Sequence, residues 1–137
     1  AALPAAVLLA KLPYLQSWSE ARRAHATWYA RALAGIAGVR TPATDPSNEH
    51  IFHQYVIEAD RRDALQAHLK ERGVGSAVYY PVPLHLQPCF ASLGYKAGAM
   101  PNAEAAAGRV LALPVYPELT EAQRSHVVAS IKAFYGE

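Results

Sequence analysis

The sequence has few cysteines, no cluster of basic residues and no long apolar stretch. It has one cysteine, Cys89, which excludes an internal disulfide and is typical of a reducing compartment. Its 13 basic and 11 acidic residues form no clustered basic stripe, so we expect no nucleic-acid partner. The longest uncharged apolar stretch, residues 1–10, is about half of a membrane span and no basic residue precedes it. We therefore expect a cytoplasmic protein without a membrane segment or signal peptide.

The length and composition are those of one globular domain. Of the 137 residues 52% are hydrophobic, but 28 are alanines, so leucine, valine, isoleucine and the aromatic residues must supply the core volume. A chain of this size buries enough surface for one core without a disulfide or metal. The only methionine is Met100, which fits removal of an initiator residue or excision from a longer protein.

Apolar spacing and turn residues predict helices around a small sheet. A helix is expected over the first forty residues, with a kink or restart near residue 14 where Pro13 and the Ser17/Glu20 capping-box spacing occur. The other expected elements are a strand over 53–58, a helix capped by Asp60 and ending at Arg72 and Gly73, a strand over 75–80, a loop over 81–98, a helix over 102–111, an extended segment over 113–117 and a last helix with a Thr120/Gln123 capping box. Three or four helices around about three strands predict a two-layer α+β domain.

Histidines and the cysteine give no convincing catalytic set. His50, His53 and His85 are the only histidines with plausible reach to one metal ion, but no cysteine or carboxylate lies nearby at zinc-ligand spacing, so we expect no metal. Cys89 follows His85 by four residues, yet nothing orients that imidazole, and an inert packed thiol is the expected state. His25, His68 and His126 are expected on polar or boundary faces of helices. No nucleophile elbow or phosphate-cradling glycine loop is present.

The segment Tyr79–Pro88, YYPVPLHLQP, is the most distinctive in the chain. Two phenols, an imidazole and an amide on a proline-stiffened loop suit contacts to a hydroxyl-rich ligand or to a partner chain. The alternative is structural, with the tyrosines packed under the loop and the prolines only stiffening it. The residues alone leave both interpretations open.

Four blocks of the sequence resemble the DegT/DnrJ/StrS family of PLP-dependent aminotransferases, which act on nucleotide-linked keto-sugars. They are LPYLQSWSEARRAHATWY (12–29), HIFHQYVI (50–57), RRDALQAHLKERGVGSAVYYPVPLHLQP (61–88) and AEAAAGRVLALPVYPELT (103–120). The resemblance covers nearly the whole chain and only about the last third of a typical member. It implies the C-terminal small domain of a fold-type I enzyme, with residues 1–38 as the connecting helix and 50–137 as the α+β core.

The resemblance also implies which functions this chain lacks. In the family the larger N-terminal domain supplies the lysine that forms the PLP Schiff base and most of the phosphate site. None of Lys11, Lys70, Lys96 and Lys132 is expected to take that role, so we assign no catalytic or cofactor-binding residue here and expect no covalently bound PLP. Pro4 departs from the glutamine common in the family at the start of its connecting helix.

The family's small domain contributes to the sugar-nucleotide site, and the matching residues here are Tyr79, Tyr80, His85 and His53. Tyr80 and His85 are expected to orient the sugar or diphosphate by hydrogen bonds. Tyr79 replaces a histidine found in many relatives, and His50 is expected only to orient its neighbours. The resemblance also implies a homodimer, and we expect self-association of the isolated domain. The alternatives are a non-catalytic sugar-nucleotide-binding or interaction module, or part of a PLP-dependent sugar dehydratase.

Overall fold

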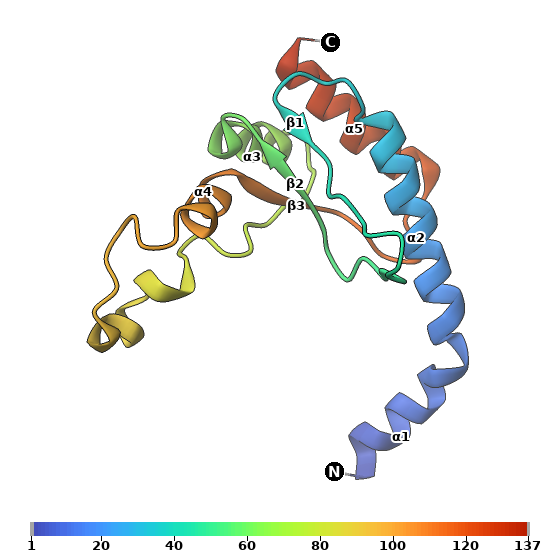
Figure 1. The fold of residues 1–137 in the computed structure, drawn as a ribbon. Helices are drawn as coiled ribbons and strands as arrows, with labels where there is room; N and C mark the ends of the chain where they lie inside the picture. Colours follow the sequence, from blue (N-terminus) through green and yellow to red (C-terminus); the bar gives the residue numbers. More distant parts are fainter. Residues whose placement is uncertain (1, 137) are drawn as a thin grey trace.

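The computed structural model describes residues 2–136, which form one sheet and five α-helices (Figure 1). In chain order the elements are α1 (Ala2–Lys11), α2 (Leu15–Ala32), β1 (Val39–Arg40), β2 (Tyr55–Ala59), α3 (Arg62–Glu71), α4 (Pro101–Arg109), β3 (Val110–Leu113) and α5 (Glu121–Tyr135). Short 3-10 turns lie at Leu12–Tyr14, Leu84–Leu86 and Pro88–Leu93. The segment predicted as an irregular loop over 81–98 therefore contains two 3-10 turns.

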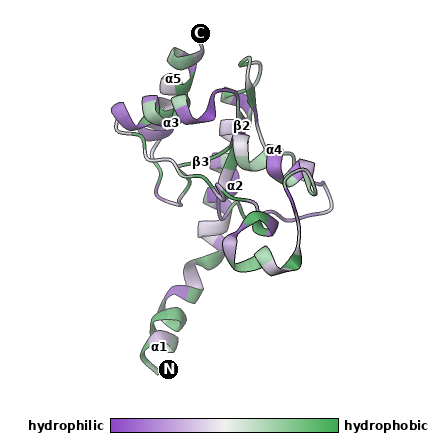
Figure 2. Cartoon of the chain, turned by 90° about the vertical axis from the view of Figure 1, so that its left-hand side faces the viewer, coloured by the Kyte–Doolittle hydropathy of each residue, from purple (hydrophilic) through white to green (hydrophobic). Residues whose placement is uncertain are grey.

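The predicted restart of the first helix is confirmed, although its predicted cap is wrong. A 3-10 turn containing Pro13 separates α1 from α2. The Ser17 hydroxyl donates to the Tyr14 carbonyl at 2.9 Å and Glu20 accepts from Gln16, so neither residue caps the helix. No residue of α1 is buried, and α1 projects from the rest of the molecule (Figures 1 and 2).

The three strands form an antiparallel sheet in the order β1-β2-β3, with Tyr55 opposite Leu113 and Ile57 opposite Leu111. The predicted number of strands is confirmed, but the strand predicted over 75–80 is wrong. Only Ala77 pairs there, with Ala112, through hydrogen bonds of 3.2 and 2.7 Å. In this register the next bonded pairs would use the N–H groups of Pro114 and Val110. Proline has no N–H group and Val110 donates to Ala106 in α4, so the ladder stops in both directions.

The remaining strand is β1, which the sequence analysis did not predict because it has only two residues. Val39 lies opposite Ala59 at the edge of the sheet. Gly38 precedes it with a φ of +86°, and its carbonyl accepts from the Asp60 amide at 2.8 Å. A glycine at this position allows the chain to turn from α2 into the sheet.

Two predicted helix ends are also corrected. Asp60 does not cap α3; the N-cap is Arg61, with a φ of 53° and no side-chain cap, while the Asp60 carboxylate binds Arg109 at 3.1 Å. The helix predicted over 102–111 is α4, which ends at Arg109 because the next residues pair with β2. Residues 113–117, predicted as a short strand or extended segment, belong to a strand only at Leu113, because the strand lies earlier, at Val110–Leu113.

Other helix signals are confirmed. The Thr120 hydroxyl accepts from the backbone N–H of Gln123, and the Gln123 side-chain oxygen accepts from the backbone N–H of Thr120. These two hydrogen bonds complete the capping box of α5. Gly73 follows the C-cap of α3 with a φ of +72°. The start of α5 and the end of α3 agree with the prediction because both depend on local backbone hydrogen bonding.

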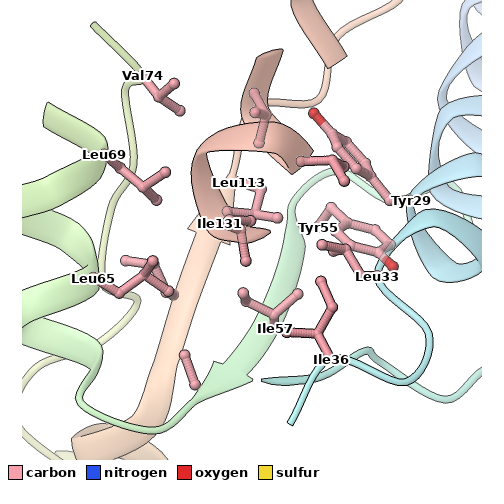
Figure 3. Close-up of a cluster of buried hydrophobic side chains, with 14 of the residues drawn as sticks. Tyr29, Leu33, Ile36, Tyr55, Ile57, Leu65, Leu69, Val74, Leu113 and Ile131 are labelled. Carbon is pink, nitrogen blue, oxygen red and sulfur yellow. The ribbon is translucent and has the colours of Figure 1, made fainter. Parts of the chain in front are cut away.

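The core lies between one face of the sheet and the helices α2, α3 and α5 (Figure 3). Burial alternates along β2, with Tyr55, Ile57 and Ala59 inside. They pack against Tyr29 and Leu33 of α2, Leu65 and Leu69 of α3, and Val127, Val128 and Ile131 of α5. The predicted two-layer α+β fold is confirmed. The core also fixes the carboxyl end of β3 and the 73–77 segment, where the candidate site begins.

Candidate functional site

The predicted site residues Tyr79 and Tyr80 lie where the chain leaves the edge of the sheet. The bridge between Ala77 and Ala112 holds the preceding backbone. Both tyrosines are exposed, Tyr80 more than Tyr79, and their rings meet edge to face with centroids 5.9 Å apart. The sheet therefore anchors two phenols whose hydroxyls are accessible to a ligand.

The first depression brings Tyr79 together with His53. It has a volume of about 550 Å³ and lies between residues 73–77, the end of β3 and the start of α5. Besides His53 and Tyr79, the side chains with polar groups that line it are those of Gln54, Ser76, Tyr116, Gln123 and His126. The same depression is also lined by apolar side chains, among them Val74, Leu113 and Val127. Hydroxyls, amides and imidazoles next to apolar side chains are suited to a polar ligand with one flat or apolar part.

A second depression, also about 550 Å³, lies on the other side of Tyr79. Tyr79 and Tyr80 form one end of it. Val82, Pro83, Leu84 and Gln87 form one wall, and Ala103, Ala106, Ala107 and Val110 form the other. Tyr79 is thus shared by both depressions, whereas Tyr80 lines only the second of these two.

His85 is set apart from the other three predicted residues. It is 7% exposed and lines neither depression. Its Nε2 atom lies 3.0 Å from the Glu104 carboxylate of α4, and the Tyr95 ring stands edge-on to the imidazole. His53 and Tyr79 therefore line one depression and Tyr79 and Tyr80 line the other, whereas His85 is buried within the loop that follows them.

The backbone around His53 is held by Arg22 of α2. The Arg22 guanidinium donates to the carbonyls of Phe52 and His53, each at 3.3 Å, and to that of Val115 at 2.9 Å. His50 contributes through Nδ1, which accepts from the Phe52 amide at 2.9 Å. These contacts join the segment before β2 to the segment after β3. Both segments line the first depression.

Glu104 was not predicted from the sequence. Its carboxylate accepts from His85, from the Gly98 amide at 2.9 Å and from the Met100 amide at 3.2 Å. The hydrogen bond from Gly98, followed by that from His85, lowers the pKa of the Glu104 carboxyl. A sequence signal exists, because Glu104 is the only acidic residue between Glu71 and Glu118.

The other histidines and the cysteine take different places. His25 is buried, which corrects its predicted boundary position; its Nε2 donates to the Pro117 carbonyl and its Nδ1 accepts from Arg124. The predicted packed state of Cys89 is wrong, because the thiol is exposed and lies 3.9 Å from the Gln87 amide oxygen. Within residues 2–136 no three histidine, cysteine or acidic side chains gather closely enough to hold a metal ion.

The four lysines of this chain lie outside the candidate site. Lys11, Lys70 and Lys96 are exposed and Lys132 is half-buried. Neither depression around Tyr79 is lined by a lysine. In the part of the chain that the structure describes, no helix is long and apolar enough to cross a bilayer.

Relatives of known name match almost all of this chain. It is 53% identical over 135 residues to a protein of Geobacillus stearothermophilus named a pleiotropic regulatory protein, covering 97% of this chain and 36% of that protein. It is 38% identical over 130 residues to the dTDP-3-amino-3,4,6-trideoxy-alpha-D-glucose transaminase of Streptomyces venezuelae, covering 95% and 34%.

Solved structures agree with the sequence comparison. DesV of S. venezuelae, solved with a ketimine intermediate, superimposes with a TM-score of 0.93 at 37% identity, over 97% of this chain and 36% of that one. A DegT DnrJ EryC1 StrS aminotransferase from Brucella abortus gives 0.89 at 38%, over 97% and 35%. The chain thus spans about a third of the length of these relatives. The DegT/DnrJ/EryC1/StrS aminotransferase model matches residues 1–132, and the chain belongs to this family.

Proposed function

We propose that this chain is the C-terminal part of a PLP-dependent aminotransferase that transfers an amino group to a nucleotide-linked keto-sugar. The observation that carries the proposal is the position of Tyr79, shared by two adjoining depressions with His53 on one side and Tyr80 on the other. A nucleotide sugar has two unlike parts joined by a diphosphate, and two depressions that share the Tyr79 side chain suit such a ligand.

The relatives support the choice of substrate class. One is named for a dTDP-linked amino sugar and another, from Acidithiobacillus ferrooxidans, is a UDP-N-acetyl-3-dehydro-alpha-D-glucosamine 3-aminotransferase, 38% identical over 130 residues. The nucleotide and the sugar differ between them. The shared chemistry, an amino group placed on a nucleotide-linked sugar, is what we assign to the whole protein.

This part of the protein would bind and orient the sugar nucleotide, and the Schiff-base lysine would lie elsewhere in the polypeptide. PLP supplies an electron sink for amino transfer when bound. His53, Tyr79 and Tyr80 would donate or accept hydrogen bonds at the sugar and diphosphate. His85, which is buried within the loop after Tyr80, would help to orient the ligand at the same site. Orientation of this kind raises the rate without any bond being made to these side chains.

The test is calorimetric titration of the full-length protein with dTDP- and UDP-linked sugars. Tyr80→Phe and Tyr79→Phe are expected to weaken binding several-fold, because each removes one hydroxyl that contacts the ligand. Tyr14→Phe is the matched control, since Tyr14 is an exposed phenol at the start of α2, outside both depressions. Unchanged affinity in both site variants would overturn the assignment.

The covalent part of the proposal has its own measurement. Titration of the 137-residue chain with PLP is expected to give no stoichiometric aldimine on Lys11, Lys70, Lys96 or Lys132 after borohydride reduction. A single lysine labelled in this way would contradict the assignment of the Schiff base to another part of the protein.

The proposal also includes a homodimer and a cytoplasmic location. Leu3, Leu8 and Leu9 on α1 are 68–78% exposed, and apolar side chains at such exposure favour association. Sedimentation of this chain is expected to show self-association that increases with concentration. A strictly monomeric species at high concentration would count against it.

A second candidate is a sugar-nucleotide-binding module without catalysis. It is favoured by the name of the Geobacillus relative, a pleiotropic regulatory protein, which describes regulation and not transamination. Transaminase assays of the full-length protein with glutamate and keto-sugar nucleotides separate the two: binding without turnover supports the module, and turnover supports the enzyme.

A further inference from the structure

The residues 81–100, called the arm below, leave the sheet and return to it at α4. In Figure 1 the arm runs from yellow to orange and extends away from the sheet. Nearly all of its side chains are exposed or half-buried, and His85 is its one buried residue. A segment with so few buried contacts needs specific hydrogen bonds to keep one conformation.

Glu104 supplies hydrogen bonds to the arm at three separate positions. Its carboxylate accepts from the His85 imidazole near the start of the arm and from the amides of Gly98 and Met100 near its end. The bonds to His85 and Gly98 measure 3.0 and 2.9 Å. One side chain of α4 therefore joins both ends of the arm to the same helix.

The same contact fixes the hydrogen positions on His85. An ionised carboxylate only accepts hydrogen bonds, so His85 Nε2 must carry the hydrogen. In the neutral imidazole the other nitrogen, Nδ1, then has a lone pair and is an acceptor. The groups that face this imidazole are the Glu104 carboxylate and the Tyr95 ring.

The second depression lies between the two elements that Glu104 connects. One wall consists of arm residues 82–84 and Gln87, on either side of His85. The other wall consists of Ala103, Ala106, Ala107 and Val110, on either side of Glu104. The bond from His85 to Glu104 therefore ties the two walls together.

We propose that Glu104 is a positioning residue that holds the arm against α4, keeps His85 in its Nε2–H form and so sets the width of the depression next to Tyr80. It touches no ligand itself and acts through His85 and the arm backbone. The effect on ligand binding rests on the proposed function, whereas the effect on the arm does not.

The first test is hydrogen exchange of the wild-type chain and Glu104→Gln. The glutamine keeps the side-chain length but loses the charge and one acceptor oxygen, so amides of the arm are expected to exchange about tenfold faster while those of α2 and α5 are unchanged. Glu71→Gln, an exposed glutamate of α3, is the control and should alter no arm amide. Unchanged arm exchange in both Glu104→Gln and Glu104→Ala overturns the proposal.

Nitrogen NMR of the His85 imidazole provides a readout that loss of packing alone does not change. At a pH where the imidazole is neutral, the wild-type chain is expected to carry the hydrogen on Nε2 and none on Nδ1. In Glu104→Gln, whose amide can either donate or accept, both neutral forms are expected. A wild-type spectrum with the hydrogen on Nδ1 overturns the assigned role.

The last test uses the full-length protein and its affinity for dTDP- and UDP-linked sugars. Glu104→Gln is expected to weaken binding about three- to tenfold. The change in kcat is expected to be smaller, because a residue that positions the arm affects ligand affinity more than it affects the reacting atoms. If Tyr80→Phe weakens binding and Glu104→Gln does not, the link between the arm and the site is wrong. If the wild type binds no sugar nucleotide, the proposed function fails, and the exchange and NMR results still decide the role of Glu104 in the arm.

Discussion

The rings of Tyr29 and Tyr55 stack in the core with centroids 5.2 Å apart, but among residues 2–136 only the Tyr29 hydroxyl makes a hydrogen bond of good geometry. The Tyr29 hydroxyl donates to the Pro114 carbonyl at 3.0 Å, which joins α2 to the end of β3. The Tyr55 hydroxyl is buried and makes no hydrogen bond of good geometry among residues 2–136, although the Thr41 side chain lies close enough to it to oppose the rise of its pKa. Two neighbouring phenols thus contribute to stability in different ways.

Removing each hydroxyl separately tests this difference. Tyr29→Phe leaves the Pro114 carbonyl without its donor and is expected to lower the free energy of unfolding by about 1 kcal/mol. Tyr55→Phe removes an unpartnered polar group and is expected to leave that free energy unchanged or raise it. Urea denaturation of the two variants beside the wild type measures both values, and equal losses would contradict the assignment.

The raised pKa values of Tyr29 and Tyr55 predict that the protein loses stability at high pH. Burial raises the pKa of Tyr55 to about 12 and also raises the pKa of Tyr29. Because the unfolded phenol ionises near pH 10, the folded state is fully favoured below that pH and loses stability as the pH rises toward 12. For Tyr55 the full loss is about 3 kcal/mol.

The measurement is the free energy of unfolding at a series of pH values between 9 and 12. Tyr55→Phe is expected to show a shallower decline than the wild type because one of the phenols with a raised pKa is removed. Parallel declines would mean that Tyr55 does not contribute to the pH dependence.

The sequence predicted the elements that depend on local hydrogen bonds and missed those that depend on distant partners. The Thr120/Gln123 capping box and the glycine after α3 are confirmed since each involves residues close in sequence. The strand expected over 75–80 fails because the chain opposite it contributes Pro114 and an N–H of Val110 that is already bonded. Asp60 has the residue type of an N-cap, but its carboxylate binds Arg109, 49 residues away.

The candidate site shows the same limit. Tyr79 and Tyr80 stand out in the sequence because they end a predicted strand and precede two prolines. That His53 and Tyr79 line the same depression depends on the pairing of β2 with β3, which spacing alone does not give. Glu104 is separated from His85 by 19 residues, and only the folded arm brings them together.

Arg22 is expected to be important for stability, unlike its neighbour Arg23. Arg22→Met removes a charged donor from the carbonyls of Phe52, His53 and Val115 and is expected to cost about 2–3 kcal/mol. Arg23→Met breaks an ion pair with Glu49, whose side chain is 74% exposed, and is expected to cost below about 1 kcal/mol. Chemical denaturation gives the two losses, and exchange of the 52–54 amides reports the loosened backbone. Similar losses in both variants would refute the role of Arg22.

Packing in the core predicts a contrast between buried and exposed leucines. Leu69→Ala removes a fully buried side chain of α3 and is expected to lower the free energy of unfolding by about 3 kcal/mol. Leu8→Ala alters a residue of α1 that is 68% exposed and is expected to change it by less than about 0.5 kcal/mol. The comparison uses urea denaturation at low protein concentration, so that association through α1 does not contribute. A large loss in Leu8→Ala at that concentration would show that α1 packs within one chain.

Gly38 and Gly73 both have positive φ values, but only Gly38 is tightly enclosed. A Cβ atom at Gly38 would lie 3.0 Å from Cε1 of Tyr135 and 3.2 Å from Oδ2 of Asp60, whereas at Gly73 nothing lies within 4 Å. Gly73→Ala is expected to cost about 1–2 kcal/mol, the strain of a left-handed backbone alone. Gly38→Ala adds a steric clash and displaces Tyr135, whose hydroxyl donates to the Asp60 carbonyl at 2.6 Å, so a loss of about 3 kcal/mol or more is expected. Thermal unfolding of the two variants compares them directly, and equal losses would mean that Tyr135 moves aside at no cost and that backbone strain alone accounts for the glycine at position 38.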